Sequence, residues 1–368
     1  MNGQARSGAV LSVDLDALAA NYRTLSTMAG PGRCAAVVKA DAYGLGAGPV
    51  ARRLTEEGCD TFFVATLGEG LALRAMLADD VGIFVLNGIP PGAETEAVKA
   101  NLVPVVNTMG AIERWRREAR RQGAPLDAAV QVDSGMTRLG LSKEDVLTIA
   151  GNPDLLSGIR PVLFMSHLAC ADEPSSPANM AQLKAFRGLR SLFPQIPASL
   201  ANSSGIFLGR EYGFNLARPG AALYGINPVP GADNPMRPVV SLKARVLQVR
   251  EVGEGVSVGY GHRYRATRDR RLAVISIGYA DGWMRHVDLG AIHGKKCLPL
   301  AGRVSMDSIT VDASGIPPDR LREGDQLDLI NGRQTVDAVA AAAGTIGYEV
   351  LCGLGQRIAR EYVHSHGN

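Results

Sequence analysis

A lysine follows a short apolar run near the start of the chain, in residues 35–48 with the sequence AAVVKADAYGLGAG. Glycine-rich loops that bind dinucleotides follow their strand directly, so that main-chain N–H groups reach the pyrophosphate. Here Lys39 and Tyr43 stand between the apolar run and the glycines. The dinucleotide interpretation is therefore weak. Lys39 is either an ordinary lysine paired with Asp41, or a lysine that burial keeps partly neutral and able to form a Schiff base.

Other reactive side chains also stand directly after short β-rich runs. His167 follows one of them, and it is the only histidine in the first 261 residues. In a parallel barrel the C-terminal ends of the strands meet at one face, where active sites form. We therefore expect one shared site for the side chains at these positions, which are Lys39, Tyr43, Asp133, Arg138, His167, Asn202, Ser203 and Arg218.

The β-rich runs alternate with segments of helical periodicity, which is typical of an α/β fold with a (β/α)8 TIM-type barrel. A doubly wound sheet is the main alternative, and the number of runs favours the barrel. The predicted strands are residues 35–38, 61–65, 82–86, 103–106, 128–132, 161–166, 198–201 and 214–216. The predicted helices include residues 68–77, 109–122, 143–150 and 179–192.

The pattern changes after Pro235 to strands separated by Gly and Asp turns, which predicts a C-terminal mainly-β domain. The segment NPVPGADNP, residues 227–235, has the composition of a linker. We predict a barrel over residues 10–234 and a β domain over residues 235–368, with residues 1–9 pairing with the β domain. Its predicted elements are strands 239–249, 272–277, 296–300, 307–311 and 326–330 and a helix at 336–343.

The composition narrows the partners and the compartment. The 39 basic and 36 acidic residues leave a net charge of +3, too little to predict a nucleic-acid or membrane partner. No apolar run approaches the length of a membrane span. The five cysteines are scattered without metal-ligand spacing. This pattern predicts reduced thiols in the cytoplasm, and no metal site.

Nine motifs together resemble those of the bacterial alanine racemases, which are pyridoxal-phosphate enzymes built from a barrel and a β domain. The resemblance extends from Val13 to Ala359, with the motifs in the order and spacing of the family. It implies an α/β barrel fold, pyridoxal 5′-phosphate as the cofactor and isomerase activity on alanine. The motifs are AVVKADAYGLG, VDSGMTRLG, SHLACADE, NSSG, RPGAALYG, VGYG, IGYADGW, GRVSMD and TIGYE.

The resemblance implies that Lys39 carries the cofactor covalently and that Arg218 faces its pyridine nitrogen. An arginine there does not readily give up its proton, which discourages transamination. The remaining residues implied for cofactor binding, several of them around the phosphate, are Tyr43, His167, Asn202, Ser203, Gly220, Ala221 and Tyr348.

Inversion at Cα needs a proton acceptor on each face, and the resemblance assigns these roles to Lys39 and Tyr260. It also implies a hydrogen-bonded chain from Tyr260 through His167 to Arg218, which favours the phenolate. Tyr260 belongs to the predicted β domain, and in the family this domain completes the site of the other subunit. The resemblance therefore implies a homodimer with composite active sites.

Substrate contacts follow from the same motifs. Arg138 and the main chain of Met306 would bind the substrate carboxylate, and Tyr279 and Tyr348 would narrow the entrance. Four residues match the polar outer lining of that entrance, namely Asp172, Arg285, Arg303 and Ile346.

Two positions depart from the family pattern. Gln131 stands where many members have a carbamylated lysine that holds the arginine seven residues later, and Thr137 replaces a frequent glycine. A neutral amide cannot supply the charge of the carbamate. We expect either the amide of Gln131 or a bound anion to take that place beside Arg138.

The predicted function is interconversion of L- and D-alanine, either to supply D-alanine for peptidoglycan or to degrade it. One alternative is a racemase with broader substrates, such as serine. A second is a decarboxylase of ornithine or diaminopimelate, which usually has a carboxylate where this chain has Arg218. A third is a non-catalytic cofactor carrier, which has the barrel but lacks the β domain.

Overall fold

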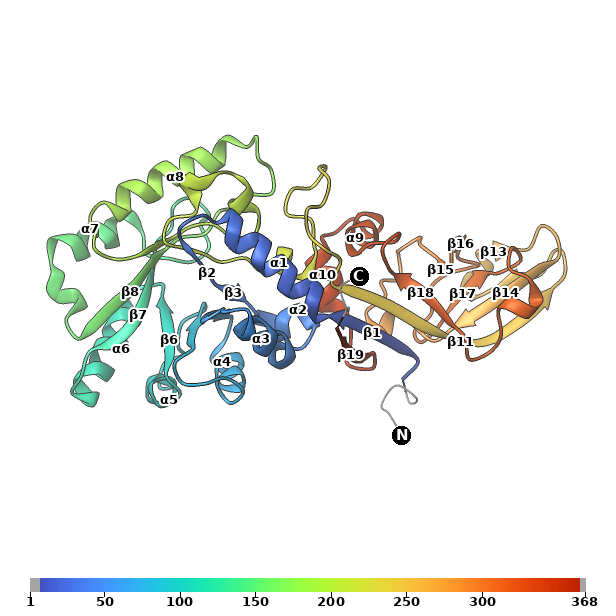
Figure 1. Ribbon diagram of the computed structural model, residues 1–368, viewed down its shortest axis with the longest axis horizontal. Coiled ribbons are helices and arrows are strands. Elements are labelled where there is room, and N and C mark those ends of the chain that lie inside the picture. Colours follow the sequence, from blue (N-terminus) through green and yellow to red (C-terminus); the bar gives the residue numbers. More distant parts are fainter. Residues whose placement is uncertain (1–6, 365–368) are drawn as a thin grey trace.

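The computed structural model describes residues 7–364, which form a barrel and a mainly-β part arranged end to end (Figure 1). The barrel strands from β3 to β9 are parallel neighbours in chain order. They are β3 (Ala36–Val37), β4 (Thr61–Val64), β5 (Gly82–Val85), β6 (Leu102–Val106), β7 (Leu126–Gln131), β8 (Ile159–Met165) and β9 (Ala198–Ser199).

Two further strands close the barrel. β10 (Leu216–Ala217) pairs in parallel with β2 (Arg33–Cys34), which leads into β3. On the other side, the N–H of Asn215 donates to the carbonyl of Ala198 over 2.9 Å, and that of Arg218 donates to Ala201 over 2.9 Å. The eight predicted β-rich runs therefore form a closed barrel, which confirms the predicted fold.

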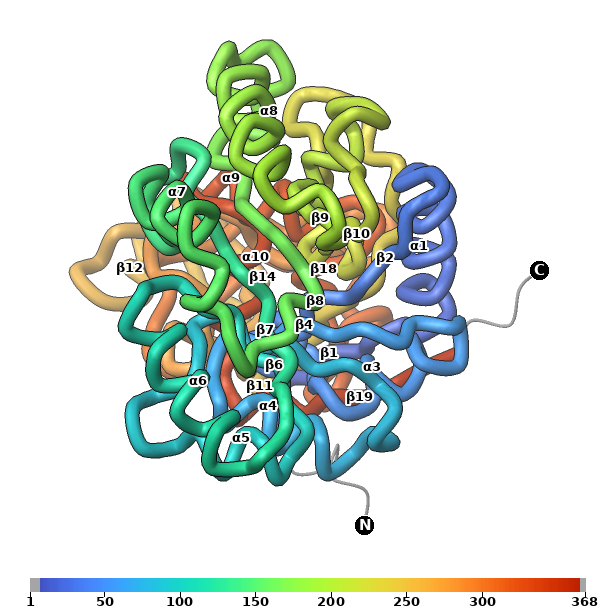
Figure 2. The backbone as a smooth tube through the Cα atoms, turned by 90° about the vertical axis from the view of Figure 1, so that its left-hand side faces the viewer, coloured from blue at the N-terminus to red at the C-terminus, as the bar shows by residue number. Residues whose placement is uncertain are grey.

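Apolar side chains fill the inside of the barrel. Phe63 and Phe84 stack with their ring centroids 4.9 Å apart, within a cluster that includes Val105, Leu163 and Met165. The helices lie around the strands, as Figure 2 shows. They are α1 (Leu15–Met28), α3 (Ala47–Glu56), α4 (Leu67–Arg74), α5 (Glu94–Lys99), α6 (Met109–Gln122), α7 (Lys143–Gly151) and α8 (Pro177–Arg190).

The mainly-β part is organised by the long strand β11 (Val240–Val252), which pairs with β1 (Ala9–Asp14), β14 (Arg270–Ile275) and β18 (Gln326–Ile330). The path β16-β15-β18-β11-β1-β19 makes most of its sheet, and β14 pairs in addition with β17. The other strands are β12 (Ser257–Val258), β13 (Tyr264–Arg265), β14 (Arg270–Ile275), β15 (Ala291–His293), β16 (Lys296–Leu298), β17 (Ile309–Asp312) and β18 (Gln326–Ile330). The helices α9 (Val336–Ala343) and α10 (Gly347–Gly353) follow.

The first and last strands of the described chain lie side by side. β1 (Ala9–Asp14) is antiparallel to β11 and parallel to β19 (Ala359–Val363). Residues 9–14 therefore belong to the sheet of the β part. The predicted pairing of residues 1–6 lies outside the described residues, and the domain limits at 10, 234 and 235 stay predictions.

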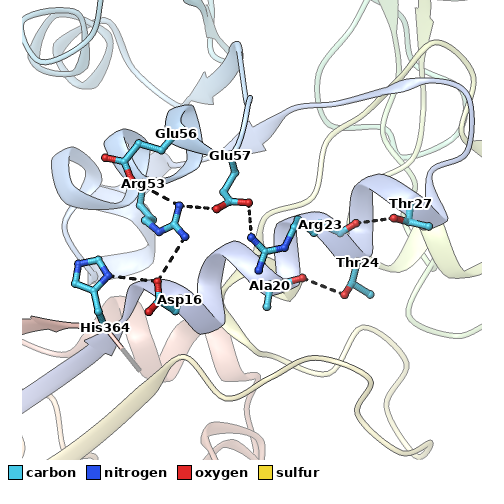
Figure 3. A network of polar contacts seen from close by, with 9 residues as sticks. All are labelled: Asp16, Ala20, Arg23, Thr24, Thr27, Arg53, Glu56, Glu57 and His364. Carbon is cyan, nitrogen blue, oxygen red and sulfur yellow. Dashed lines mark hydrogen bonds and ion pairs between the residues drawn. The ribbon is translucent and has the colours of Figure 1, made fainter. Parts of the chain in front are cut away.

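A polar network on the outside of the barrel ties the end of the chain to α1 and α3 (Figure 3). Arg53 forms ion pairs with Glu57, over 2.6 Å, and with Asp16, over 3.5 Å. Arg23 also contacts Glu57, and the Nδ1 atom of His364 lies 3.3 Å from Asp16 Oδ1. Arg53 and Glu57 are partly exposed, and ion pairs at the protein surface contribute about 0–1 kcal/mol each, so we regard the network as a local tether.

Within residues 7–364, no single helix is both long and apolar enough to cross a membrane. The pair α9 and α10 reaches the required length and hydropathy only together, across a bend of 95°.

Candidate active site

A cavity of about 360 Å³ opens where the barrel strands end. Ten of the residues predicted for the site line it: Lys39, Tyr43, Arg138, His167, Asn202, Ser203, Arg218, Gly220, Ala221 and Tyr348. Asp172, predicted for the outer lining, also lies there, as do Leu86, Met136 and Cys352. The strand ends thus bring together residues that are far apart in the sequence.

Lys39 begins an unusual turn, α2 (Lys39–Gly44). The next four residues have φ between 52° and 58°, the left-handed helical region, and none of them is glycine; they are Ala40, Asp41, Ala42 and Tyr43. This conformation costs an L-residue about 1–2 kcal/mol. The surrounding structure must hold the turn, and the turn fixes Lys39 and Tyr43 relative to each other.

The beginning of the turn is held by Glu69 of α4. Its Oε1 atom accepts a hydrogen bond of 2.9 Å from the N–H of Ala40, and its Oε2 atom accepts one of 2.7 Å from the N–H of Ala65. Glu69 also forms a capping box with Thr66 at the start of α4. One carboxylate therefore joins the end of β4 to the residue that follows Lys39.

The environment of Lys39 favours the neutral amine. Burial, and then the charge of Arg138, lower the pKa of Lys39 below its ordinary value. A lysine with a lowered pKa is a better nucleophile and proton acceptor near neutral pH. The structure therefore supports the second interpretation of Lys39, a reactive lysine.

Arg218 extends into the barrel interior and is 3% exposed. Its Nη2 atom donates to the carbonyl oxygen of Ser166 over 2.6 Å, and Nη1 donates to Ser199 Oγ. Its Cζ atom lies 5.8 Å from the centroid of the Phe63 ring. Burial lowers the pKa of Arg218 to about 10, so the guanidinium remains charged at neutral pH.

His167 is held through its main chain by Gln182 of α8. Gln182 Nε2 donates to the carbonyl of His167 over 3.0 Å, and Gln182 Oε1 accepts from the N–H of Ala169 over 2.8 Å. Burial, followed by the charges of Arg218, Arg138 and Lys39, lowers the pKa of His167 to about 3. The imidazole is therefore neutral in this environment. No hydrogen bond joins His167 to Arg218 in the described part of the chain, so the predicted proton chain stays a prediction.

The loop that carries Arg138 is fixed by its neighbours. Asp133 Oδ1 accepts hydrogen bonds from the N–H groups of Gly135, Met136 and Thr137, at 2.8–3.1 Å. The Nε2 atom of the buried Gln131 donates to the carbonyl of Leu139 over 3.1 Å. The amide of Gln131 thus contacts the main chain of the residue after Arg138, and the expected occupant of the place beside the Arg138 side chain stays a prediction. Thr137 has φ 56°, where the family often has glycine.

Donor groups gather at one end of the cavity. Ser203 Oγ accepts from the N–H of Gly220 over 3.0 Å and from that of Ala222 over 3.1 Å. A Cβ atom on Gly220 would lie 2.3 Å from the hydroxyl oxygen of Tyr43, so a larger residue there would displace the Tyr43 ring. Because Ser203 Oγ accepts both bonds, its own proton can be donated, and the hydroxyl groups of Ser203 and Tyr43 suit a phosphate.

The charges around the cavity fit a phosphorylated cofactor. Arg138 and Arg218 bring positive charge to it, whereas Asp172 is the one acidic residue among its lining residues. Arg218 forms its hydrogen bonds with uncharged groups. An anionic ligand would balance this charge, and the donors at the Ser203 end would hold its phosphate. The residues present therefore fit pyridoxal phosphate.

Three predicted site residues lie outside the cavity, in the β part. Tyr260, Met306 and Tyr279 are 68%, 52% and 42% exposed. They do not line the cavity of their own chain. Arg285, Arg303 and Ile346 are likewise absent from its lining.

Glu69 was not among the predicted site residues, although the spacing Thr66-Leu67-Gly68-Glu69 is that of a capping box and marks the start of a helix. Cys352, which α10 brings to the cavity, was not predicted either. No local pattern connects Cys352 with Lys39, because they are far apart along the chain.

The two parts match two models of one family. Residues 13–228 match the alanine racemase N-terminal domain, and residues 239–362 match the alanine racemase C-terminal domain. Over 360 residues the chain is 54% identical to a catabolic alanine racemase of Mesorhizobium japonicum, covering 98% of this chain and 94% of that protein. It is 48% identical over 364 residues to a catabolic alanine racemase of Agrobacterium fabrum, covering 98% of this chain and 94% of that protein.

A solved structure has the same fold. The crystal structure of alanine racemase from Bartonella henselae with covalently bound pyridoxal phosphate superposes with a TM-score of 0.92 at 40% identity. The match covers 97% of this chain and 100% of that one.

Proposed function

The chain belongs to the alanine racemase family, and from this premise we propose that it interconverts L- and D-alanine by a two-base mechanism, with Lys39 acting on one face of Cα and Tyr260 of the partner subunit on the other. The enzyme is an isomerase that uses pyridoxal phosphate. The observation that carries the proposal is the position of Lys39, at the start of the strained turn and on the wall of a cavity lined by cationic residues.

Bound pyridoxal phosphate would supply a ring that withdraws electrons and so acidifies the Cα–H bond of an attached amino acid. Lys39 would hold it covalently, with Tyr43, Asn202, Ser203, Tyr348 and the main chain at Gly220 and Ala221 around its phosphate end. Arg218 would face the ring. Because Arg218 keeps its own proton at neutral pH, it would leave the ring a moderate electron acceptor, which favours return of the proton to Cα.

Lys39 can serve as the first base because burial lowers its pKa. The second base must approach from the opposite face, and neither Tyr260 nor Tyr279 lines the cavity of its own chain. Tyr260 is 68% exposed, which leaves it free to enter the site of another molecule. We therefore propose a homodimer in which His167 lies between Tyr260 of the partner subunit and Arg218.

Arg138 lines the cavity on a loop fixed by Asp133 and Gln131, which suits it to bind the substrate carboxylate. The main chain of Met306 of the partner subunit would add a donor. Tyr348, together with Tyr279 of the partner subunit, would narrow the entrance and leave room for a methyl side chain.

The cellular role that we favour is breakdown of D-alanine, because the relatives at 54% and 48% identity are both described as catabolic. We place the enzyme in the cytoplasm, since all five cysteines are free and suit a reducing compartment. Deleting the gene should then impair growth on D-alanine without creating a requirement for it. A strict requirement for D-alanine would instead indicate supply for peptidoglycan.

The test of the activity is incubation of the purified enzyme with L-alanine or L-serine in deuterated water. We expect D-alanine labelled with deuterium at Cα, and much slower turnover of serine. Equal rates on the two substrates would favour the broader racemase. Loss of carbon dioxide would favour a decarboxylase, and no turnover would reject catalysis.

A further inference from the structure

The strained turn after Lys39 ends at two carbonyl groups that are held by the last strand of the chain. Arg360 donates to the carbonyl oxygen of Gly44 from Nε, over 3.2 Å, and from Nη2, over 3.1 Å. The hydroxyl of Tyr362 donates to the carbonyl oxygen of Leu45 over 3.0 Å. Both residues belong to β19. We propose that Arg360 and Tyr362 form a C-terminal clamp that positions Lys39 and Tyr43 for catalysis.

Arg360 connects the turn to a second wall of the cavity. Its other hydrogen bonds go to the carbonyls of Leu354, over 2.7 Å, Gly355, over 2.5 Å, and Ile358, over 2.8 Å. Leu354 directly follows α10, which carries Tyr348 and Cys352 into the cavity lining. One guanidinium therefore holds α10 and the turn of Lys39 at a fixed distance. In Figure 1, α2, α10 and β19 lie close together where the barrel meets the β part.

Two glycines at the end of the turn, Gly44 and Gly46, allow it to lie close to α10 and to Tyr362. Gly46 has φ 99°, and a Cβ atom there would lie 2.0 Å from the hydroxyl oxygen of Tyr362. Gly44 has φ 83°, and a Cβ atom there would lie 2.7 Å from the carbonyl oxygen of Leu351 in α10. The absence of side chains lets the turn approach the clamp and α10 closely.

Hydrogen bonds inside the turn hold its middle: the N–H of Leu45 donates to the carbonyl of Ala42 over 3.2 Å, and that of Ala47 donates to Asp41 Oδ1 over 2.7 Å. Within it, the N–H of Ala42 donates to Val38 over 2.8 Å, and that of Gly46 donates to Asp41 over 2.9 Å. Glu69 holds the first residue, Ala40, as described above. The C-terminal clamp holds the opposite end, so the left-handed residues are fixed from both sides. Loss of the clamp should let them relax toward ordinary conformations and shift Lys39.

Arg74 provides a matched control. Like Arg360, it is partly buried and donates to several main-chain carbonyls, namely those of Ala78, Val81, Ala100 and Asn101. Burial lowers its pKa, as it does that of Arg360. Arg74 does not line the cavity. A variant at Arg74 thus removes the same kind of contact from the barrel without touching the turn.

The experiment compares Arg360→Ala, Arg360→Lys, Tyr362→Phe and Arg74→Ala. In Arg360→Ala we expect kcat for alanine to fall about 10- to 100-fold with KM changed less than about threefold, because small displacements of reacting groups cost rate. Amide hydrogen exchange in residues 38–47 should accelerate at least about tenfold, in the apoenzyme as well as the holoenzyme. For Arg360→Lys, kcat and the exchange rate should lie between those of the wild type and Arg360→Ala, because an ammonium group reaches one carbonyl but cannot span three segments. Arg74→Ala should leave kcat and this exchange unchanged.

The clamp is rejected if Arg360→Ala matches Arg74→Ala in both kcat and exchange. If Arg360→Ala does not fold, Tyr362→Phe decides: we expect faster exchange in residues 38–47 and a several-fold lower kcat, and wild-type values for both would overturn the proposal. The kcat comparison rests on the proposed function, whereas the exchange comparison does not. Wild-type protein without racemase activity, but with a loosened turn in Arg360→Ala, would therefore reject the function and retain the clamp.

Discussion

Arg218 and Ser166 are joined inside the barrel by a hydrogen bond of 2.6 Å, from the guanidinium Nη2 atom to the main-chain carbonyl oxygen. The second guanidinium nitrogen contacts Ser199 Oγ, which itself donates to the carbonyl of Leu216. A full positive charge is therefore buried among neutral partners. Burying a charge without an opposite charge is costly, so this arrangement should serve activity at the expense of stability.

The first prediction concerns Arg218→Met in the apoenzyme. We expect its free energy of unfolding in urea to stay the same or to rise by about 1–4 kcal/mol, because an apolar side chain of similar length replaces a buried charge. Racemase activity should fall at least about 100-fold, because the charge that faces the cofactor is lost. A clear loss of stability in Arg218→Met would show instead that the two hydrogen bonds outweigh the cost of burying the charge.

The second prediction concerns Lys39→Ala, which should abolish covalent attachment of the cofactor. Lys39 is the only lysine among the residues that line the cavity. Borohydride reduction of the wild-type holoenzyme, followed by peptide mapping, should place the pyridoxyl group on Lys39. Lys143, at the start of α7, and Lys243, which lies 3.8 Å from Asp328, serve as internal controls. Label on either of them would show that Lys39 has been assigned wrongly.

The third prediction concerns the pH dependence of stability. The pKa of His167 is about 3 in the folded chain, against about 6.5 for an unfolded histidine. Between these values the unfolded chain binds one more proton than the folded one, so His167 makes the folded state less stable as the pH falls from 6.5 toward 3. The slope is at most about 1.4 kcal/mol per pH unit.

Urea unfolding of the apoenzyme at pH 7, 6 and 5 measures this slope, and His167→Gln is the control because glutamine does not titrate. We expect the free energy of unfolding of the wild type to decrease, relative to that of His167→Gln, as the pH falls. A difference that stays constant over this range would mean that His167 is readily protonated in the folded protein.

The barrel could be predicted closely because its signals are local. The predicted helix at 109–122 coincides with α6, since Thr108 caps its start and Gly123 ends it in the left-handed conformation. The predicted strands lie within a few residues of those observed because each is a short apolar run between turns. Seven of the eight residues expected from the rule that reactive side chains gather after the strands line the cavity, and Asp133 does not. Gly220, Ala221 and Tyr348, which also line it, were expected from the family motifs.

What could not be predicted depends on long-range contacts. β1 pairs with β11 and β19, more than 200 residues away, over residues 9–14, whereas only residues 1–9 were predicted to pair with the β domain. The left-handed turn at residues 40–43 contains no glycine, so no local sequence pattern predicts its conformation. Its conformation depends on Glu69, Arg360 and Tyr362, which come from two distant segments. A sequence pattern indicates which residues follow a strand, but not which remote side chains hold them.

The fourth prediction concerns Gln131 and the loop of Arg138. Removing the amide in Gln131→Ala leaves the carbonyl of Leu139 without this donor, and should raise KM for alanine about 3- to 10-fold with a smaller change in kcat. Gln131→Glu, which cannot donate to that carbonyl, should behave in the same way. Added bicarbonate should not change the activity of the wild type, because glutamine cannot be carbamylated. Strong dependence on bicarbonate would contradict this account of the loop.

The fifth prediction tests whether each site takes Lys39 from one chain and Tyr260 from the other. Tyr260 is 68% exposed in its own chain and absent from the cavity that Lys39 lines, so we expect the two bases to meet across a dimer. Homodimers of Lys39→Ala and of Tyr260→Phe should each be nearly inactive, since both of their sites lack one base. A mixed dimer combines both changes in one site and leaves the other site intact.

After the two variants are unfolded and refolded together, random pairing makes about half of the dimers mixed, so about a quarter of all sites should regain activity. Mass spectrometry of the refolded sample confirms that mixed dimers are present. If they are present and the sample stays as inactive as its parents, both bases come from the same chain.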